Sequence, residues 1–178
     1  MSLKEFKLDE LKDKSKGSFV SGPFGSNISS KFFVEVGVPV IRGNNLTKGK
    51  EKFIDDNYVF INEKKAHELR GCQAIPGDII FTAAGTLGQI GLMPNNLKYK
   101  KYIISNKQIR FRCNDEIVDP LYLYYYLSNP IMRDLIENQN KGSSIPLLTL
   151  GSLKWLPIFL PEKKIQKKIS KYLYLYDE

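Results

Sequence analysis

Short apolar runs separated by turn-forming residues dominate the first two thirds of the chain. Between residues 19 and 54, glycine, proline and asparagine interrupt apolar runs such as 38–41, and this pattern predicts short strands joined by turns. A Pro-Gly-Asp turn at residues 76–78 leads into the apolar run 79–81, and a second short strand is expected at residues 89–93. We therefore expect a sheet of short strands in this part of the chain.

Residues 108–113 alternate strictly between two kinds of side chain. Every second residue from Ile109 is apolar, whereas Gln108, Arg110 and Arg112 are polar or basic. Successive side chains of a strand point to opposite faces of a sheet. We therefore expect one face of this strand to lie in the core and the other face to be basic.

Signals for two helix starts appear in the last third of the chain. An Asp-Pro pair stands at residues 119–120 and an Asn-Pro pair at residues 129–130. A side-chain N-cap followed by proline at the first helical position is typical of a helix start. The two pairs predict helices over residues 121–127 and from residue 131 to about residue 138, before a polar loop around residues 141–144.

A short helix or turn at residues 146–155 and a strand at 156–160 are expected to close the domain. Beyond them, four residues spaced four, three and four apart form one helical stripe: Ile165, Ile169, Tyr172 and Tyr176. The stripe is either the start of a coiled-coil seam or the face by which a short helix folds back onto the domain. We divide the chain into a domain over residues 1–160 and a helical tail over residues 161–178.

The distribution of charge suits a polyanionic partner. The 178 residues include 27 Lys plus Arg against 19 Asp plus Glu, which gives a formal net charge of +8. The stretch 98–112 holds six basic and no acidic residues, interleaved with Tyr99, Tyr102 and Phe111. This composition is typical of phosphate binding, and the alternative is a solvated basic strand face without a partner. The absence of a long apolar run or a signal peptide indicates a cytoplasmic protein.

Motifs of catalysis and of metal binding are missing from the sequence. Two cysteines and one histidine are too few for a structural zinc site or a disulfide framework. The glycines of residues 85–91 have the spacing GxxGxxG, which differs from the dinucleotide-binding fingerprint. The tetrapeptide SNPI at residues 128–131 lacks the second proline and the aromatic residue of the methyltransferase motif. We expect no enzymatic activity and no cofactor.

Five ordered blocks of the chain resemble the specificity subunits of type I restriction-modification systems. The blocks are FKLDEL at 6–11, GPFGS at 22–26, GVPVIRGNNL at 37–46, PGDIIFT at 76–82 followed by Gly85 and Gly88, and a closing run from residue 122 to Gln166. The resemblance implies an α+β target recognition domain with a twisted, mostly antiparallel sheet and short helices, followed by the start of a conserved coiled-coil spacer helix.

The family resemblance also implies a function and partners. It implies recognition of double-stranded DNA, one half of a bipartite target, in a complex with methyltransferase subunits and, through them, the restriction subunit. Those subunits would bring S-adenosylmethionine, ATP and magnesium, and this chain would bind none of them. Family members usually carry two recognition domains and two long helices, whereas this sequence has one domain and the start of one helix. It could be a half-subunit that pairs with a second copy or another specificity domain, a frameshift product or an excised fragment.

Candidate DNA-contacting residues come from several loops and one strand. Arg42, Asn44 and Asn45 suit guanine and adenine edges, with a backbone-capping turn as the alternative. Two further groups of residues are candidates. The first group is expected where the duplex backbone approaches the protein closely, with tight packing between strands as the alternative, and the second is expected to contact phosphates. The first group is Thr82, Thr86 and Gln89. The second is Lys107, Arg110, Arg112, Lys141, Ser143 and Ser144, with Ser26 and Lys31 as the next candidates.

Two other functions stay open from the sequence. One is the recognition domain of a different DNA enzyme, such as a fused restriction-methyltransferase whose catalytic region lies outside this chain. The other is a basic globular domain without a DNA role. The target bases cannot be derived from the sequence, because recognition depends also on loop geometry and on DNA shape.

Overall fold

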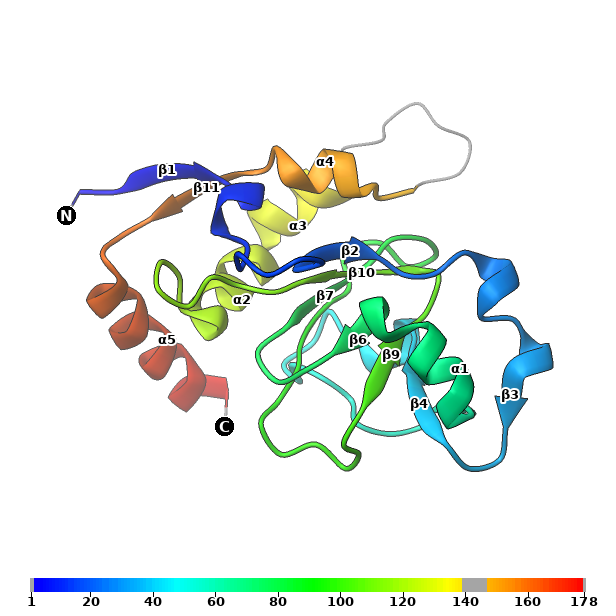
Figure 1. Ribbon diagram of the computed structural model, residues 1–178. Coiled ribbons are helices and arrows are strands. Elements are labelled where there is room, and N and C mark those ends of the chain that lie inside the picture. The colour runs from blue at the N-terminus through cyan, green and yellow to red at the C-terminus, as the bar shows by residue number, and fades with distance from the viewer. Residues whose placement is uncertain (1, 139–146, 178) are drawn as a thin grey trace.

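The strands form three sheets, in a computed structural model that describes residues 2–138 and 147–177 (Figure 1). A two-stranded sheet pairs β1 (Lys4–Lys7) with β11 (Pro157–Leu160) and so joins the two ends of the domain. A four-stranded sheet has the order β2 (Phe19–Ser21), β10 (Gln108–Phe111), β7 (Ile79–Thr82) and β8 (Ile90–Leu92). All of its pairings are antiparallel.

The third sheet has five strands and one parallel pairing. Its order is β3 (Phe33–Val34), β5 (Val59–Ile61), β4 (Val38–Ile41), β9 (Tyr102–Ile104) and β6 (Gln73–Ala74), and β4 runs parallel to β9. Helix α1 (Glu63–Glu68) and the 3-10 turn η5 (Arg70–Cys72) connect β5 to β6. The architecture is α+β with mostly antiparallel pairing, as the sequence predicted.

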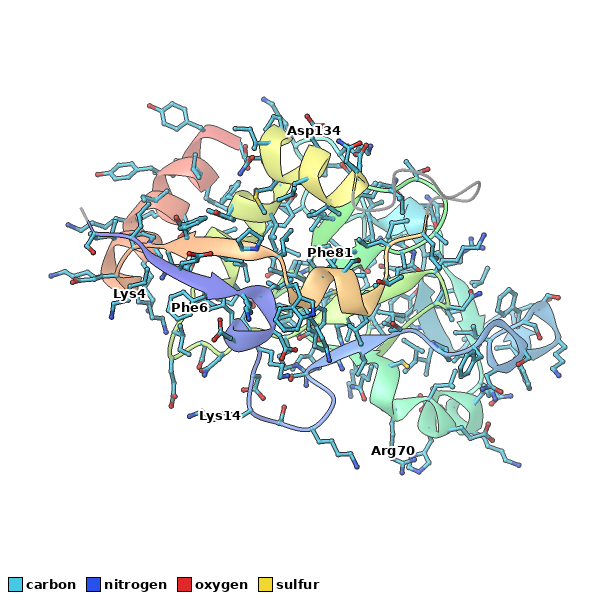
Figure 2. All side chains as sticks on the ribbon, turned by 90° about the horizontal axis from the view of Figure 1, so that it is seen from above. Lys4, Phe6, Lys14, Arg70, Phe81 and Asp134 are labelled. Atoms are coloured by element: carbon cyan, nitrogen blue, oxygen red, sulfur yellow. The ribbon has the colours of Figure 1, made fainter. Side chains whose placement is uncertain are left out.

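The four-stranded sheet lies between helices and the five-stranded sheet. In β7, Ile79 and Phe81 pack into the main core with Leu123 and Leu127 of α2 (Pro120–Ser128), whereas Ile80 points the other way. Ile80 packs in a second core with residues of the five-stranded sheet such as Tyr102. Figure 1 shows β7 and β10 between α2 and the strands β6 and β9, and Figure 2 shows Phe81 deep inside with Lys14 and Arg70 at the periphery.

Strand β10 is covered on both faces, which corrects the expectation that one of its faces is basic and exposed. Its four residues are all buried, including Gln108 and Arg110. The alternation of apolar and basic residues correctly indicated a strand with two unlike faces. The basic face is not exposed, however, because the five-stranded sheet and the loops around it cover that side.

The predicted helix starts are confirmed by their caps. The Asp119 carboxylate accepts from the Tyr122 amide at the start of α2, and the Asn129 side chain accepts from the Met132 amide at the start of α3 (Pro130–Glu137). The closing helix α4 (Leu150–Lys154) is shorter than the segment predicted, and it begins with a cap by Thr149.

The tail forms α5 (Lys163–Asp177), which packs against α2 through an unexpected face. Its buried residues are Gln166 and Ser170, and not the predicted apolar stripe. Tyr172 and Tyr176 of that stripe are 66% and 83% exposed. The Gln166 side chain accepts from the Asp119 amide and donates to backbone carbonyls, so a polar residue anchors the helix. No helix among the described residues has both the length and the apolar character to cross a bilayer.

Candidate nucleic-acid interface

The turn between β9 and β10 carries two exposed polar residues, Asn106 and Lys107. The glycine-rich loop of residues 22–27 lies directly against this turn. A Cβ at Gly22 would overlap the Ser105 carbonyl oxygen, and one at Gly25 would lie 3.1 Å from Asn106 Nδ2. Glycine is therefore required for the loop to approach the turn so closely.

A pocket beside this turn brings together three residues predicted from the sequence. It has a volume of about 370 Å³ and is lined by Ile28, Phe33, Val40, Arg42, Asn44, Ser105, Asn106 and Lys107. These eight residues include two cations and no carboxylate. Arg42 Nε is buried and has no hydrogen-bond partner among the described residues, whereas Asn44 and Lys107 are exposed. The pocket therefore offers cationic and amide groups to a ligand at the surface.

The structure assigns Asn45 to the turn itself and not to a ligand. Its side chain is fully buried, and its Oδ1 accepts from the Arg42 amide at 2.9 Å. Its Nδ2 donates to the carbonyls of Ile54 and Asp56 at 2.9 Å and 2.7 Å. The predicted base contact of Asn45 is corrected, because its amide is occupied within the protein. The neighbouring Asn44 is exposed, and its Nδ2 donates to the Asn57 carbonyl at 3.0 Å.

Thr82 and Gln89 pair with each other and support the loop between β7 and β8. Thr82 is 2% exposed and its hydroxyl donates to Gln89 Oε1, while Gln89 Nε2 donates to the Leu46 carbonyl. These contacts correct the expectation that Thr82 lies on a surface open to DNA, and they match the packing alternative. Thr86 at the tip of the loop is exposed. The Ala83 amide donates to the Lys107 carbonyl at 2.7 Å, which places the loop beside Lys107.

Arg110 and Arg112 are held by one buried carboxylate. Asp78 is fully buried and lies 3.4 Å from Arg110 Nη1, and its two oxygens accept from Arg112 at 2.8 Å and 2.9 Å. Arg110 also donates to the carbonyls of Gly17 and Gly71. Burial lowers the pKa of Arg110, whereas the hydrogen bonds to Asp78 raise the pKa of Arg112. The predicted phosphate contacts of this strand are corrected, because the Asp78 carboxylate holds both guanidinium groups and Arg110 is buried among loop carbonyls, although the Arg112 side chain is 27% exposed.

The acid-free stretch 98–112 does not form one face. Lys98 and Lys101 precede β9, whereas Lys107 follows it. Carboxylates from other parts of the chain lie beside the first group, because Lys101 pairs with Glu63 at 2.9 Å and Lys98 lies 3.9 Å from Asp56. These acidic partners could not be found from the sequence, because they lie far from the lysines along the chain. Lys107 is the basic residue of this stretch that lines the pocket.

The aromatic residues of the same stretch are used in packing. Tyr102 is fully buried, and its hydroxyl and that of Tyr58 both donate to Asp55 Oδ1. Burial is the larger cause that raises the pKa of both tyrosines, and the hydrogen bond to the shared Asp55 carboxylate is the second. Tyr99 packs edge-on against Tyr58 and Phe60. These rings form an aromatic cluster under the loop before β9 and are not arranged as a stacking platform for bases.

The remaining predicted residues fall into two groups. Ser26 and Lys31 are exposed, and both lie close in sequence to the pocket residue Ile28. Lys141, Ser143 and Ser144 lie outside the described residues. Leu148, which follows them, donates its amide to the Ala83 carbonyl at 2.8 Å.

Two exposed residues at this surface were missed by the sequence reasoning: Asn106 and Phe24. Phe24 is 84% exposed and lies in the loop that packs on the turn at Asn106. The signal that could have found both is the pair of glycines at 22 and 25, because glycine is the residue that allows a close backbone approach. Within residues 2–138 and 147–177, no cluster of His, Cys, Asp or Glu side chains is arranged to hold a metal ion.

The family model for the type I restriction modification DNA specificity domain matches residues 3–178 of the chain. The protein belongs to this family. The family is one of specificity domains and is not catalytic, in agreement with the sequence prediction that the chain is not an enzyme.

Two curated relatives are specificity subunits of type I restriction enzymes. The chain is 32% identical over 78 residues to the type I restriction enzyme MjaVIII specificity subunit of Methanocaldococcus jannaschii, covering 44% of this chain and 18% of that protein. It is 23% identical over 137 residues to the EcoBI specificity subunit of Escherichia coli, covering 76% of this chain and 28% of that protein. The matched region thus spans less than a third of either relative.

Solved structures share the fold at low identity. The HsdS subunit from Thermoanaerobacter tengcongensis matches with a TM-score of 0.62 and 18% identity, over 97% of this chain and 36% of that one. The S subunit from M. genitalium has the same TM-score and identity, over 98% and 39%. The type IIG restriction endonuclease BpuSI matches with a TM-score of 0.60 and 11% identity, over 96% and 26%.

Proposed function

We propose that this specificity domain reads the sequence of double-stranded DNA, one half of a bipartite target, for a type I restriction-modification complex. The observation that carries the proposal is the pocket formed by Arg42, Asn44 and Lys107 beside the glycine-rich loop. It joins a planar guanidinium, an exposed amide and an exposed ammonium on one surface. Family membership supplies the class of ligand, and the pocket supplies the location.

The three groups divide into two roles. Arg42 suits the O6 and N7 atoms of guanine, and Asn44 suits the N6 and N7 atoms of adenine. Lys107 is an exposed point charge on a tight turn, which suits a phosphate and fixes the register of the protein on the duplex without reading sequence. Ser26 and Thr86 are the hydroxyls that flank this surface, on the glycine-rich loop and on the loop between β7 and β8.

The scaffold under these residues supports a reading function. The Arg42 turn is fixed by the buried Asn45 amide, and the loop with Thr86 is fixed by the pair Thr82 and Gln89. Contact residues held by a rigid scaffold lose little conformational freedom when they bind. The buried residues that were first expected to touch DNA therefore act as supports for the exposed ones.

The proposed partners follow from the family and from α5. We propose that α5 begins the spacer helix that joins methyltransferase subunits, and through them the restriction subunit, in the cytoplasm. The exposed residues Tyr172 and Tyr176 of α5 are available for such a helix contact, with a second copy or another specificity domain as an additional partner. S-adenosylmethionine, ATP and magnesium would be bound by those partners and not by this domain.

A second candidate function is the recognition domain of a different restriction enzyme. The similarity of fold to BpuSI, at a TM-score of 0.60, favours this alternative, although its identity of 11% supports the fold alone. The match of the type I family model to residues 3–178 favours the first proposal. Co-purification distinguishes them, because only a type I domain should bind separately encoded methyltransferase subunits.

Selection from a randomised duplex pool at defined salt tests the proposal. The purified chain should retain molecules that share a short motif, and competition with unselected DNA should confirm the preference. An Arg42→Ala variant should lose enrichment at one position of the motif, whereas Lys101→Ala, at the opposite end of β9, should keep the whole motif. Retention without any common motif would contradict sequence reading.

A further inference from the structure

Phe24 is a large apolar side chain at the surface of the candidate interface, with 84% of its area exposed. It stands directly before the 3-10 turn η2 (Gly25–Asn27) in the glycine-rich loop. Single exposed apolar residues are common on proteins, so exposure alone does not define a role. The position of Phe24 beside the pocket and the rigidity of the loop that carries it do indicate a role.

The backbone that carries the ring is fixed on both sides. Before Phe24, the Gly22 amide donates to the Gln108 carbonyl at 2.8 Å. After it, the Asn27 amide donates to the Phe24 carbonyl at 2.8 Å, and Ile28 is buried in the core of the five-stranded sheet. The two glycines leave no space for other side chains between the loop and the turn at Asn106. The ring is therefore presented to solvent by a braced loop.

The groups around Phe24 indicate which part of a bound duplex its ring would contact. Asn106, which touches the loop, lines the same pocket as Arg42 and Lys107. On a duplex, the cation of Lys107 would meet phosphates, which offer nothing to an apolar ring. The apolar surfaces that a duplex offers are the thymine methyl groups in the major groove and the faces of the bases, and a ring on a braced loop reaches the faces as phenylalanine side chains do when they enter between base pairs in DNA-bending proteins.

We propose that Phe24 is an aromatic wedge that inserts between adjacent base pairs of the bound duplex and thereby contributes to specificity. Flexible base steps unstack more easily than stiff ones, so the ring would favour particular sequences without a hydrogen bond to any base. The proposal rests on the DNA-reading function and adds a residue and a mode of recognition to it.

Fluorescence of 2-aminopurine placed at successive positions of the selected target tests the wedge, because unstacking increases this fluorescence. The full chain should raise the signal at one base step. Phe24→Ala should abolish the rise and weaken binding to the target by about fivefold to a hundredfold, in keeping with about 1–3 kcal/mol per stacked base. Phe24→Trp, which keeps an aromatic ring that can stack on a base, should retain both the rise and the affinity.

A matched control is Val36→Ala. Val36 is 87% exposed, and β4 separates it from Arg42, so its removal should leave binding unchanged. The salt dependence of binding should stay the same in Phe24→Ala, because no phosphate contact is removed, and the melting temperature should not fall, because the ring is not packed. A lower affinity together with a lower melting temperature would indicate a structural role and overturn the proposal.

Failure of the wedge differs from failure of the proposed function. If Arg42→Ala and Lys107→Ala weaken binding but Phe24→Ala does not, the wedge is wrong and DNA reading stands. Binding that weakens in Phe24→Ala without a 2-aminopurine signal at any step of the wild-type complex would also overturn the wedge. A wild-type chain that retains no motif from the pool would overturn both.

Discussion

The Lys52 ammonium lies 2.9 Å from the Asp177 carboxylate, although the two residues are 125 positions apart in the sequence. The same ammonium lies 5.2 Å from the ring of Tyr125 and 4.9 Å from the ring of Tyr174. The Tyr125 hydroxyl donates to Asp177 as well. This cluster fixes the C-terminal end of α5 to the domain, while Gln166 fixes its beginning. The direction of α5 is thus set at both ends.

Replacement of Lys52 by methionine should loosen the end of α5 without unfolding the domain. The variant removes an ion pair and two cation–ring contacts, which together stabilise the helix end by about 1–2 kcal/mol. Hydrogen exchange of the last turns of α5 should accelerate correspondingly, while exchange in β7 stays unchanged. Lys16→Met serves as the control, because Lys16 is exposed and makes no ion pair among the described residues. Equal exchange in both variants would refute the role of Lys52.

The attachment of α5 should weaken in acid. The hydrogen bond from Tyr125, and then Lys52, lower the pKa of Asp177 below its ordinary value of 3.8. A carboxyl whose folded-state pKa is depressed stabilises the fold fully above the unfolded value, and that contribution is lost as the pH falls through the folded value. The protection factors of the α5 amides, which correct for the pH dependence of intrinsic exchange, should therefore be constant above about pH 5 and fall below about pH 4. Asp177→Asn should abolish this dependence, and a dependence that persists in Asp177→Asn would assign it to another group.

Removal of the buried carboxylate at Asp78 should destabilise the whole domain. Asp78→Asn leaves Arg110 buried without a counter-charge, and breaking such a pair costs about 3–5 kcal/mol. Urea unfolding followed by circular dichroism measures the loss. The exposed pair of Lys14 and Glu116 provides the control, because Glu116→Gln should change stability by less than about 0.5 kcal/mol. Equal stability of the two variants would contradict the structural role of Asp78.

Two lysines at opposite ends of β9 should differ in their effect on DNA binding. Lys107→Ala should lower affinity for all duplexes and reduce the slope of log affinity against log salt by about 0.9, the value expected for one phosphate contact. Lys101→Ala should leave that slope unchanged, because Lys101 pairs with Glu63 away from the pocket. Titrations between low and moderate salt measure both slopes. A smaller slope only in Lys101→Ala would move the interface to the other end of the strand.

Arg42 and Asn45 lie in one turn and should respond differently to truncation. Arg42→Ala should cost about 1–3 kcal/mol on the selected target and much less on random DNA, because a base contact is lost. Asn45→Ala should instead reduce the free energy of unfolding by about 2–3 kcal/mol, because three buried hydrogen bonds are lost. Binding isotherms and urea unfolding of both variants separate these effects. A stable Asn45→Ala protein with lost sequence preference would restore Asn45 as a base reader.

Local signals in the sequence determined two of the helix starts and the strand β10. The Asp119 and Asn129 caps are followed within three residues by the amides that they accept from, so each helix start is specified by adjacent residues. The alternation in β10 likewise depends on the period of a strand and needs no distant contact. The glycines at 22 and 25 predicted a turn, and the structure shows in addition that they let the backbone approach the turn at Ser105 and Asn106.

Tertiary contacts decided which polar residues are free to bind. The sequence shows that Arg110 lies on one face of a strand, but Asp78, 32 positions earlier, neutralises it, and the second sheet covers it. Asn45 is buried because Ile54 and Asp56 return to accept its amide protons. Helix α5 turns Gln166 inward because that amide satisfies backbone groups at Asp119 and Pro161, which apolar side chains cannot do. Residue type and spacing determine which hydrogen bonds and ion pairs a side chain can form. The groups that the fold places beside it determine which of them it does form, and so whether it is left to bind a ligand.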